Sequence, residues 1–98
     1  MGKRKISILK TPIEGGWLFR VKIVDLDGSS SEHQVTLEEE DYRRLTAGKT
    51  DPERLIEESF KFLLEREPKE AILNRFDLTV ISHYFPEYEE EIKNRLRL

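Results

Sequence analysis

The residues closest to catalytic chemistry lie near the C-terminus, where Ser82 and His83 are adjacent and Asp77 precedes them. These three residue types form the triad of many hydrolases. Ser82 is not part of a G-x-S-x-G turn, which would expose its hydroxyl, and adjacency in sequence does not make the Ser82 and His83 side chains converge. A small hydrolase around His83 is therefore the third of three functional hypotheses. The residues favour a non-enzymatic protein with no assigned catalytic residue.

The motifs that hold cofactors or metal ions are missing from the sequence. It has no cysteine, no phosphate-binding loop, no dinucleotide-binding glycine pattern and no H-E-x-x-H. The acidic run Glu38–Asp41 fits the positive end of a helix, which attracts carboxylates, and Gly15–Gly16 fits a flexible hairpin connection. We therefore expect neither a cofactor nor a metal ion. The absence of thiols fits a reducing compartment.

A basic N-terminal region indicates contact with a polyanion. The first 24 residues contain six Lys and Arg and one Glu, although the whole chain carries a net charge of −3. Clustered cations are the electrostatic feature of phosphate-binding surfaces. The candidate contacts are Lys3, Arg4, Lys5, Arg20 and Lys22. Nucleic-acid binding is the second hypothesis, and the acidic remainder of the chain disfavours it.

The segment Ile72–Phe85 resembles the helix-turn-helix of DNA-binding proteins, with the turn at Phe76–Thr79. The resemblance implies that the second helix would enter the major groove. Asp77 stands where this motif usually has glycine, and Pro86 ends the second helix early. No Lys or Arg lies at the positions that would face the bases. Packing of these apolar residues on the core is therefore the favoured interpretation.

Alternating apolar residues in the first 37 positions predict three antiparallel strands. The first strand carries Ile6 and Ile8 and stops at Thr11–Pro12, and a turn at Asp27–Gly28 joins the second strand to the third. The second strand should turn Trp17, Phe19, Val21 and Ile23 to the core and Arg20 and Lys22 to solvent, and the third has His33, Val35 and Leu37 on one face. His33 is thus expected to be a packed or half-exposed histidine.

Helix signals occupy the rest of the chain. Thr36–Glu39 has the spacing of a capping box, which predicts a helix that begins there and ends at Gly48. Asp51–Pro52 predicts a second start, and a wide apolar stripe continues to about Glu67. Three more helical segments are predicted: Lys69–Arg75, a turn or two capped by Asp77, and a last helix from Glu87 that carries Tyr88, Ile92 and Leu96.

Four aromatic residues surround Pro86, namely Phe76, Tyr84, Phe85 and Tyr88. A proline between aromatic rings commonly fixes a chain reversal against a packed surface. We expect Phe76 and Phe85 to be buried, and Tyr84 or Tyr88 to form the rim of a self-association or partner site. The candidate interaction surface therefore consists of Tyr84, Tyr88 and His83.

Three C-terminal segments, Phe62–Pro68, Arg75–Leu78 and Tyr84–Glu89, carry the signature FLLEREP…RFDL…YFPEYE. This signature resembles that of a small family of uncharacterised prokaryotic proteins of about this length. The resemblance implies a standalone domain, and it implies no catalytic residue.

Together these patterns predict one α+β domain over residues 1–98, with an antiparallel β-meander in residues 1–37 and a helical half in residues 38–98. Three to five helices should pack on one face of the sheet. An exposed sheet edge and the surplus aromatic residues favour a non-enzymatic protein-interaction or regulatory module. Its partner would be an unidentified protein or a second copy in a homodimer. Without a transmembrane-length apolar run or a signal-peptide apolar region, we expect a cytoplasmic protein with no membrane contact.

Overall fold

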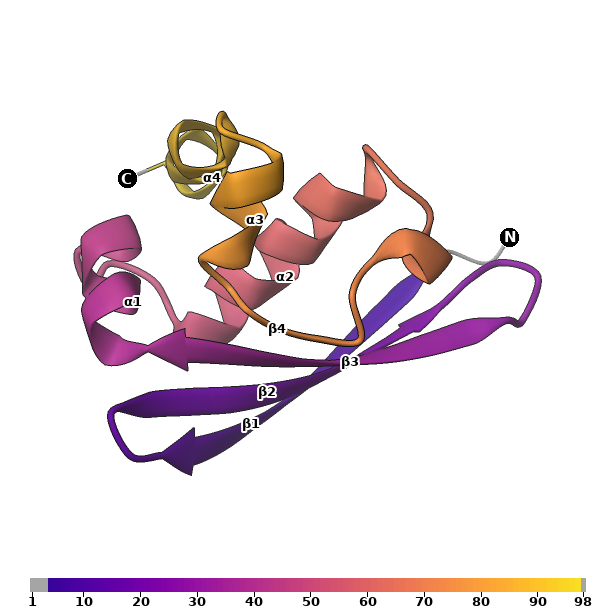
Figure 1. Cartoon of the computed structure of the whole chain (residues 1–98), viewed down its shortest axis with the longest axis horizontal. Helices are drawn as coiled ribbons and strands as arrows, with labels where there is room; N and C mark the ends of the chain where they lie inside the picture. The colour runs from indigo at the N-terminus through magenta and orange to yellow at the C-terminus, as the bar shows by residue number, and fades with distance from the viewer. Residues whose placement is uncertain (1–3, 98) are drawn as a thin grey trace.

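Four strands form one sheet in the order β1-β2-β3-β4, and the helices lie over one of its faces (Figure 1). The structure, a computed structural model, describes residues 4–97. In chain order its elements are β1 (Lys5–Ile13), β2 (Gly16–Val24), β3 (Ser30–Glu38), α1 (Glu39–Thr46), α2 (Pro52–Leu64), the 3₁₀ turn η1 (Lys69–Ala71), β4 (Arg75–Asp77), α3 (Val80–Tyr84) and α4 (Tyr88–Leu96). The α+β class is confirmed, and the sheet has one strand more than the sequence predicted.

The central strand β2 pairs with β1 and β3, both antiparallel, and buries one face beneath the helices. On that face Phe19, Val21 and Ile23 are buried and Trp17 is half-buried, whereas Arg20 and Lys22 are exposed on the other. The predicted orientation of this strand is confirmed, because only this register buries the larger apolar set. β1 continues to Ile13, past the stop predicted at Thr11–Pro12. An edge strand tolerates proline when the missing N–H faces away from the ladder.

The hairpin between β1 and β2 needs glycine at two positions for different reasons. Gly15 has a φ of +79°, a conformation that favours glycine over residues with a Cβ. Gly16 lies so close to β3 that a Cβ built on it would be 2.1 Å from the Leu37 carbonyl oxygen. Gly15 is therefore needed for the hairpin turn, and Gly16 is needed for the close packing of β2 against β3.

A short strand, β4, lies beside β3 and runs parallel to it, a pairing that the sequence analysis did not predict. Phe76 of β4 is paired with Val35 of β3, and both side chains are buried. The Thr36 hydroxyl donates a hydrogen bond to Asp77 Oδ1 at 2.7 Å, so a side-chain contact joins the two strands as well. Asp77 Oδ2 accepts hydrogen bonds from the Thr79 amide at 3.1 Å and from its hydroxyl at 2.5 Å, which fixes the turn into α3.

The boundaries of the helical half differ from several predictions. Thr36 does not cap a helix, because β3 continues to Glu38 and α1 begins only at Glu39. The capping-box prediction is wrong because pairing with β2, which reaches Gly16, keeps this segment extended. α2 begins at Pro52 as predicted but ends at Leu64.

The segment between α2 and α3 contains no α-helix. The helix predicted over Lys69–Arg75 is reduced to η1, after which the chain enters β4. The helix-turn-helix resemblance of Ile72–Phe85 is therefore wrong in structural terms. Residues 72–74 are not helical, β4 occupies the start of the predicted turn, and α3, in the place of the recognition helix, has only 5 residues.

α2 lies between the sheet and α4, and both of its faces contribute to the core. The Phe60 ring centroid lies 5.5 Å from that of His33 and 6.0 Å from that of Phe76, on the sheet side. Phe62, which the sequence placed on the flank of the stripe, is also buried and packs its ring 5.3 Å from that of Tyr88 in α4. A helix covered on two sides accounts for the unusual width of its apolar stripe.

Lys69 joins the 3₁₀ turn to the loop between β2 and β3. Its side chain is buried, and Nζ lies 2.7 Å from Asp25 Oδ2, 2.7 Å from Ser29 Oγ and 2.8 Å from Glu70 Oε2. Arg4 Nε donates a further hydrogen bond to Asp25 Oδ1 at 2.8 Å. The hydrogen bonds from Lys69 and Arg4 hold the pKa of the Asp25 carboxyl below its ordinary value of 3.8.

This lowered pKa predicts a loss of stability in acid. A carboxyl group with a lower pKa in the folded state stabilises the fold above its unfolded pKa, and the contribution is lost as pH falls through the folded pKa. Asp25→Asn should therefore be less stable than the wild type near neutral pH, and the difference in free energy of unfolding should shrink below about pH 4. Urea denaturation of both proteins over a pH series measures it. If the free energies of unfolding of the two proteins differ by the same amount at every pH in the acid range, the role given to Asp25 is contradicted.

Candidate functional site

The structure separates the two tyrosines that the sequence placed on one surface. Tyr84 is 67% exposed on α3, and His83 beside it is exposed too. Tyr88 is fully buried, and its hydroxyl lies 2.6 Å from Ser59 Oγ. Burial raises the pKa of Tyr88, so the phenol stays neutral. The inclusion of Tyr88 in the interaction surface is therefore wrong: Tyr88 starts the buried face of α4.

The residues of the hydrolase hypothesis do not form a triad. Ser82 Oγ donates a hydrogen bond to Glu89 Oε2 at 3.3 Å, and Asp77 is bonded to Thr36 and Thr79. No hydrogen bond links Ser82, His83 and Asp77 among residues 4–97. In a Ser-His-Asp triad the histidine is the base that accepts the serine proton, and Ser82 has a hydrogen bond to Glu89 in place of His83.

His33, the second imidazole, is a structural residue. It is buried, and its Nδ1 lies 2.7 Å from the Leu73 carbonyl oxygen, so Nδ1 carries the proton and donates it. Nε2 lies 2.8 Å from Ser31 Oγ. Both ring nitrogens are thus occupied in tying β3 to the segment before β4, which confirms the expectation of a packed histidine.

An apolar cavity of about 160 Å³ lies between the end of α2, η1, β4 and α3. We call it the α3 pocket. Its lining residues are Leu63, Glu67, Ala71, Ile72, Leu73, Phe76, Val80, Ile81, Tyr84 and Phe85. Leu73 is 46% exposed and Tyr84 more so, so two large side chains of the lining remain in contact with solvent. Of the predicted surface residues, the structure places Tyr84 in this lining.

Two features hold α3 and Phe85 in place around the α3 pocket. The Asp77–Thr79 hydrogen bonds fix the start of α3, and the Phe85 ring packs edge-on against Phe62 at 5.8 Å between centroids. Phe85 was predicted to be buried; it is half-buried because one side of it lines the pocket.

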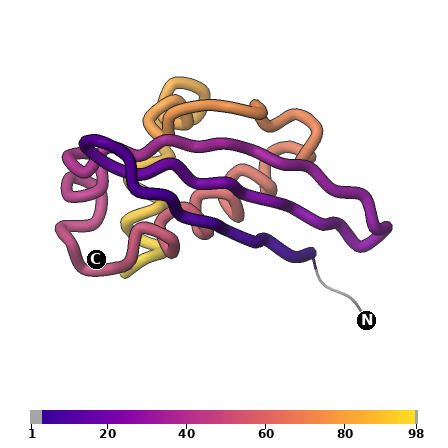
Figure 2. Tube along the Cα trace, turned by 90° about the horizontal axis from the view of Figure 1, so that it is seen from below, coloured from indigo at the N-terminus to yellow at the C-terminus, as the bar shows by residue number. Residues whose placement is uncertain are grey.

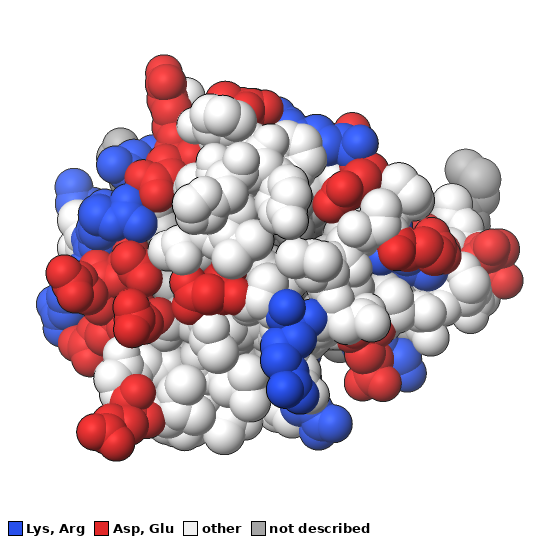
Figure 3. Space-filling model, viewed as in Figure 1, with Lys and Arg blue, Asp and Glu red and all other residues white. Residues whose placement is uncertain are grey.

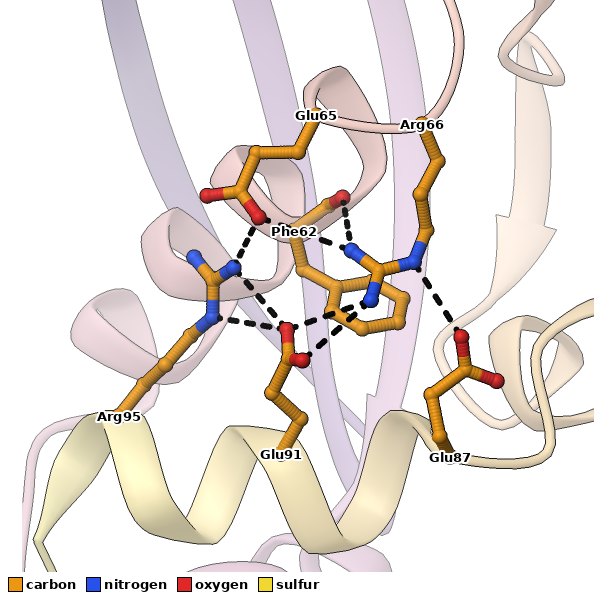
Figure 4. Close-up of polar contacts among 6 residues, drawn as sticks. All are labelled: Phe62, Glu65, Arg66, Glu87, Glu91 and Arg95. Carbon is orange, nitrogen blue, oxygen red and sulfur yellow. Dashed lines mark hydrogen bonds and ion pairs between the residues drawn. The ribbon is translucent and has the colours of Figure 1, made fainter.

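A network of charged residues fastens α4 to the end of α2 behind this region (Figure 4). The Arg66 guanidinium lies 3.6 Å from the centroid of the Phe62 ring and donates to the Phe62 carbonyl oxygen at 3.1 Å. It also donates to Glu87 and Glu91, both at 3.3 Å, and Arg95 bridges Glu91 and Glu65. These side chains point toward one another, and every carboxylate in the network is paired with at least one of the two guanidinium groups, so the network stabilises the helix pair.

The surface around the α3 pocket is largely uncharged. Figure 3 shows an area without charged side chains over α3, with acidic groups on either side of it. Glu67 is the one charged residue of the lining, and no cation lies within ion-pair distance of its carboxylate in the described part of the chain. An apolar cavity with one unneutralised carboxylate suits an apolar group that carries a positive charge beside it.

The cations proposed to bind a polyanion are only partly brought together. Lys5, Arg20 and Lys22 lie on the sheet face that the helices leave uncovered, and Arg75 joins them because Gln34, the partner of Arg20, is also paired with Arg75. The same face carries Glu32, Glu38 and Asp77. Arg4 is engaged with Asp25 instead, and Lys3 lies outside the described residues. The mixture of charges argues against a phosphate-binding surface.

Comparison with protein-family models, with curated proteins and with solved structures gives no match. Within residues 4–97, no helix is both long enough and apolar enough to cross a membrane.

Proposed function

We propose that this protein is a non-enzymatic protein-interaction module whose α3 pocket binds an apolar side chain of a protein partner. The observation that supports it is an apolar pocket with exposed Leu73 and Tyr84, on a chain in which 38% of the residues are charged. Exposed apolar surface that is rimmed by polar groups marks interaction sites.

The dimensions of the α3 pocket set the size of the group it accepts. Apolar cavities of roughly 150 Å³ take up a benzene ring, so a leucine or phenylalanine side chain fits a volume of about 160 Å³. Such a side chain would act as the anchor of the interface, in contact with Tyr84 at the rim. Tyrosines are enriched among the residues that dominate binding energy.

Glu67 sets the charge of the partner. A lysine or arginine next to the apolar anchor would pair with this carboxylate, whereas an acidic neighbour would be repelled by it. Repulsion between like charges at a partly desolvated interface is a strong source of discrimination. The proposed ligand is therefore an apolar side chain within a basic protein segment.

The test uses two short peptides, Ac-Lys-Leu-Lys-amide and Ac-Glu-Leu-Glu-amide, titrated into the full chain by calorimetry. The basic peptide should bind at least about tenfold more tightly, which corresponds to about 1.4 kcal/mol. Leu73→Ser should weaken its binding, while Leu26→Ser, which changes an exposed leucine in the β2–β3 loop, should not.

Charge reversal provides the second arm of this test. Glu67→Lys should remove the preference for the basic peptide, and Glu14→Lys, in the exposed β1–β2 turn, should keep it. Equal binding of both peptides, or equal effects of each variant and its control, would reject the proposal.

A further inference from the structure

β1 is the long free edge of the sheet. Among the described residues it pairs with β2 alone, and no further strand lies on its outer side (Figure 2). The opposite edge is shorter, because β4 pairs with three residues of β3, Gln34–Thr36, and the backbone N–H of Gln34 donates to the Asn74 carbonyl oxygen at 2.7 Å. An unpaired strand edge presents a row of backbone donors and acceptors to a partner strand.

The register of the β1–β2 hairpin shows which backbone groups of β1 face outward. Ile13 and Gly16 flank the two-residue turn, so they form a hydrogen-bonded pair, and such pairs alternate along an antiparallel ladder. The odd-numbered residues of β1 therefore bond to β2. The N–H and C=O groups of Ile6, Ile8 and Lys10 face away from the sheet. Pro12 shares this outward orientation, so the group it lacks is an edge N–H.

We infer that two copies of this protein pair antiparallel along β1, with Ile8 of each copy on the two-fold axis. In this register Ile8 faces Ile8 of the second copy, and Ile6 faces Lys10. All three are residues whose backbone groups point outward, so donors meet acceptors. The product is a continuous eight-stranded sheet with closed two-fold symmetry. This inference does not depend on the α3 pocket, which lies on other elements.

The Ile8-centred register is favoured over the two alternative registers in which Ser7 or Leu9 lies on the two-fold axis. A shift that places Ser7 on the axis brings Arg4 opposite Lys10 of the second copy, and like charges directly opposite destabilise a strand pair. A shift in the other direction places Leu9 on the axis and sets Pro12 opposite Ile6. Proline cannot donate the hydrogen bond that Ile6 would accept.

The side chains of β1 are compatible with the Ile8-centred pairing on both faces of the sheet. On the helix-covered face, the half-buried Ile8 gains an isoleucine neighbour. On the open face, Leu9 is 59% exposed and becomes the diagonal neighbour of Leu9 in the second copy. Lys10 lies opposite the uncharged Ile6 in this register and can keep its ion pair with Glu53, at 3.3 Å, within its own chain.

Single cysteines test the register, because the chain has no cysteine of its own. In the proposed register the two Cα atoms of residue 8 are about 5.5 Å apart, within the range of a disulfide, and those of residues 7 and 9 are about 7–8 Å from their own copies. Ile8→Cys should therefore cross-link on mild oxidation at least about tenfold faster than Ser7→Cys or Leu9→Cys. Fastest cross-linking at residue 7 or 9, or none at any of the three, would overturn the inference.

Sedimentation equilibrium tests the association without touching the packed Ile8. The wild type should show the mass of two chains, with Leu9→Lys raising the dissociation constant at least about tenfold through repulsion at the diagonal contact. Leu26→Lys makes the same change at a leucine that is 71% exposed and away from β1, and should leave the constant unchanged. A wild type with the mass of one chain up to its solubility limit would also overturn the inference.

Discussion

Tyr88→Glu is expected to cause the largest loss of stability of the variants considered, measured as the free energy of unfolding at 25 °C. The phenol ring is fully buried against Phe62 at 5.3 Å between centroids, and its hydroxyl has one side-chain partner, Ser59. A carboxylate in this position would lose its hydration without gaining a cation. We expect a cost of roughly 4 kcal/mol or more, a large part of the roughly 5–15 kcal/mol that stabilises a domain of this size.

Tyr84→Glu is the matched control, because it introduces the same chemical change at an exposed ring on α3. It should alter the free energy of unfolding by no more than about 0.5 kcal/mol. Urea denaturation followed by circular dichroism measures both variants against the wild type. Similar midpoints for the two glutamate variants would contradict the burial of Tyr88 and the packing of α4 on α2.

Phe60→Ala should give the second large loss of stability. The Phe60 side chain is fully buried on the side of α2 that faces the sheet, and its ring packs against those of His33 and Phe76. Removing it leaves a cavity that rigid neighbours on two strands cannot fill. The expected cost is about 3–5 kcal/mol.

The control for Phe60→Ala is Leu26→Ala, which removes an exposed apolar side chain from the β2–β3 loop and should cost less than about 0.5 kcal/mol. Chemical denaturation at equilibrium compares the two variants. A cost for Phe60→Ala below about 1 kcal/mol would mean that the junction of β3, β4 and α2 is not the centre of the core.

The sheet could be predicted where the signal was local. Four large apolar residues alternate along β2, and the register that buries them on one face buries more apolar surface than any other; they are Trp17, Phe19, Val21 and Ile23. Asp51–Pro52 likewise contains its own start signal for α2, because proline is favoured at the first helical position.

Features that depend on partners far away in sequence were missed. β4 has 3 residues, too few for a periodic pattern, and it exists because β3 offers a parallel edge to Phe76. Thr36 illustrates the competition directly: its spacing to Glu39 fits a capping box, but its hydroxyl bonds to Asp77, a residue 41 positions away. Tertiary pairing outweighed the local signal.

The candidate site was predicted in part. An exposed tyrosine near Pro86 was expected, and Tyr84 is one; Tyr88 was assigned to the same rim although its spacing to Ile92 and Leu96 follows the buried face of a helix. That periodicity was the available signal for its burial. The α3 pocket itself could not be found from sequence, because its walls come from four separate elements.

Mapping amide chemical shifts during titration with Ac-Lys-Leu-Lys-amide is the most direct test of whether the α3 pocket is the docking site. We expect the largest shifts to fall on four residues of the pocket lining and to saturate with one binding constant; these residues are Ala71, Leu73, Val80 and Tyr84. Ac-Glu-Leu-Glu-amide should leave these signals in place at the same concentrations. Shifts concentrated on Arg20 and Lys22 of the open sheet face, or no saturable shifts at all, would contradict the claim.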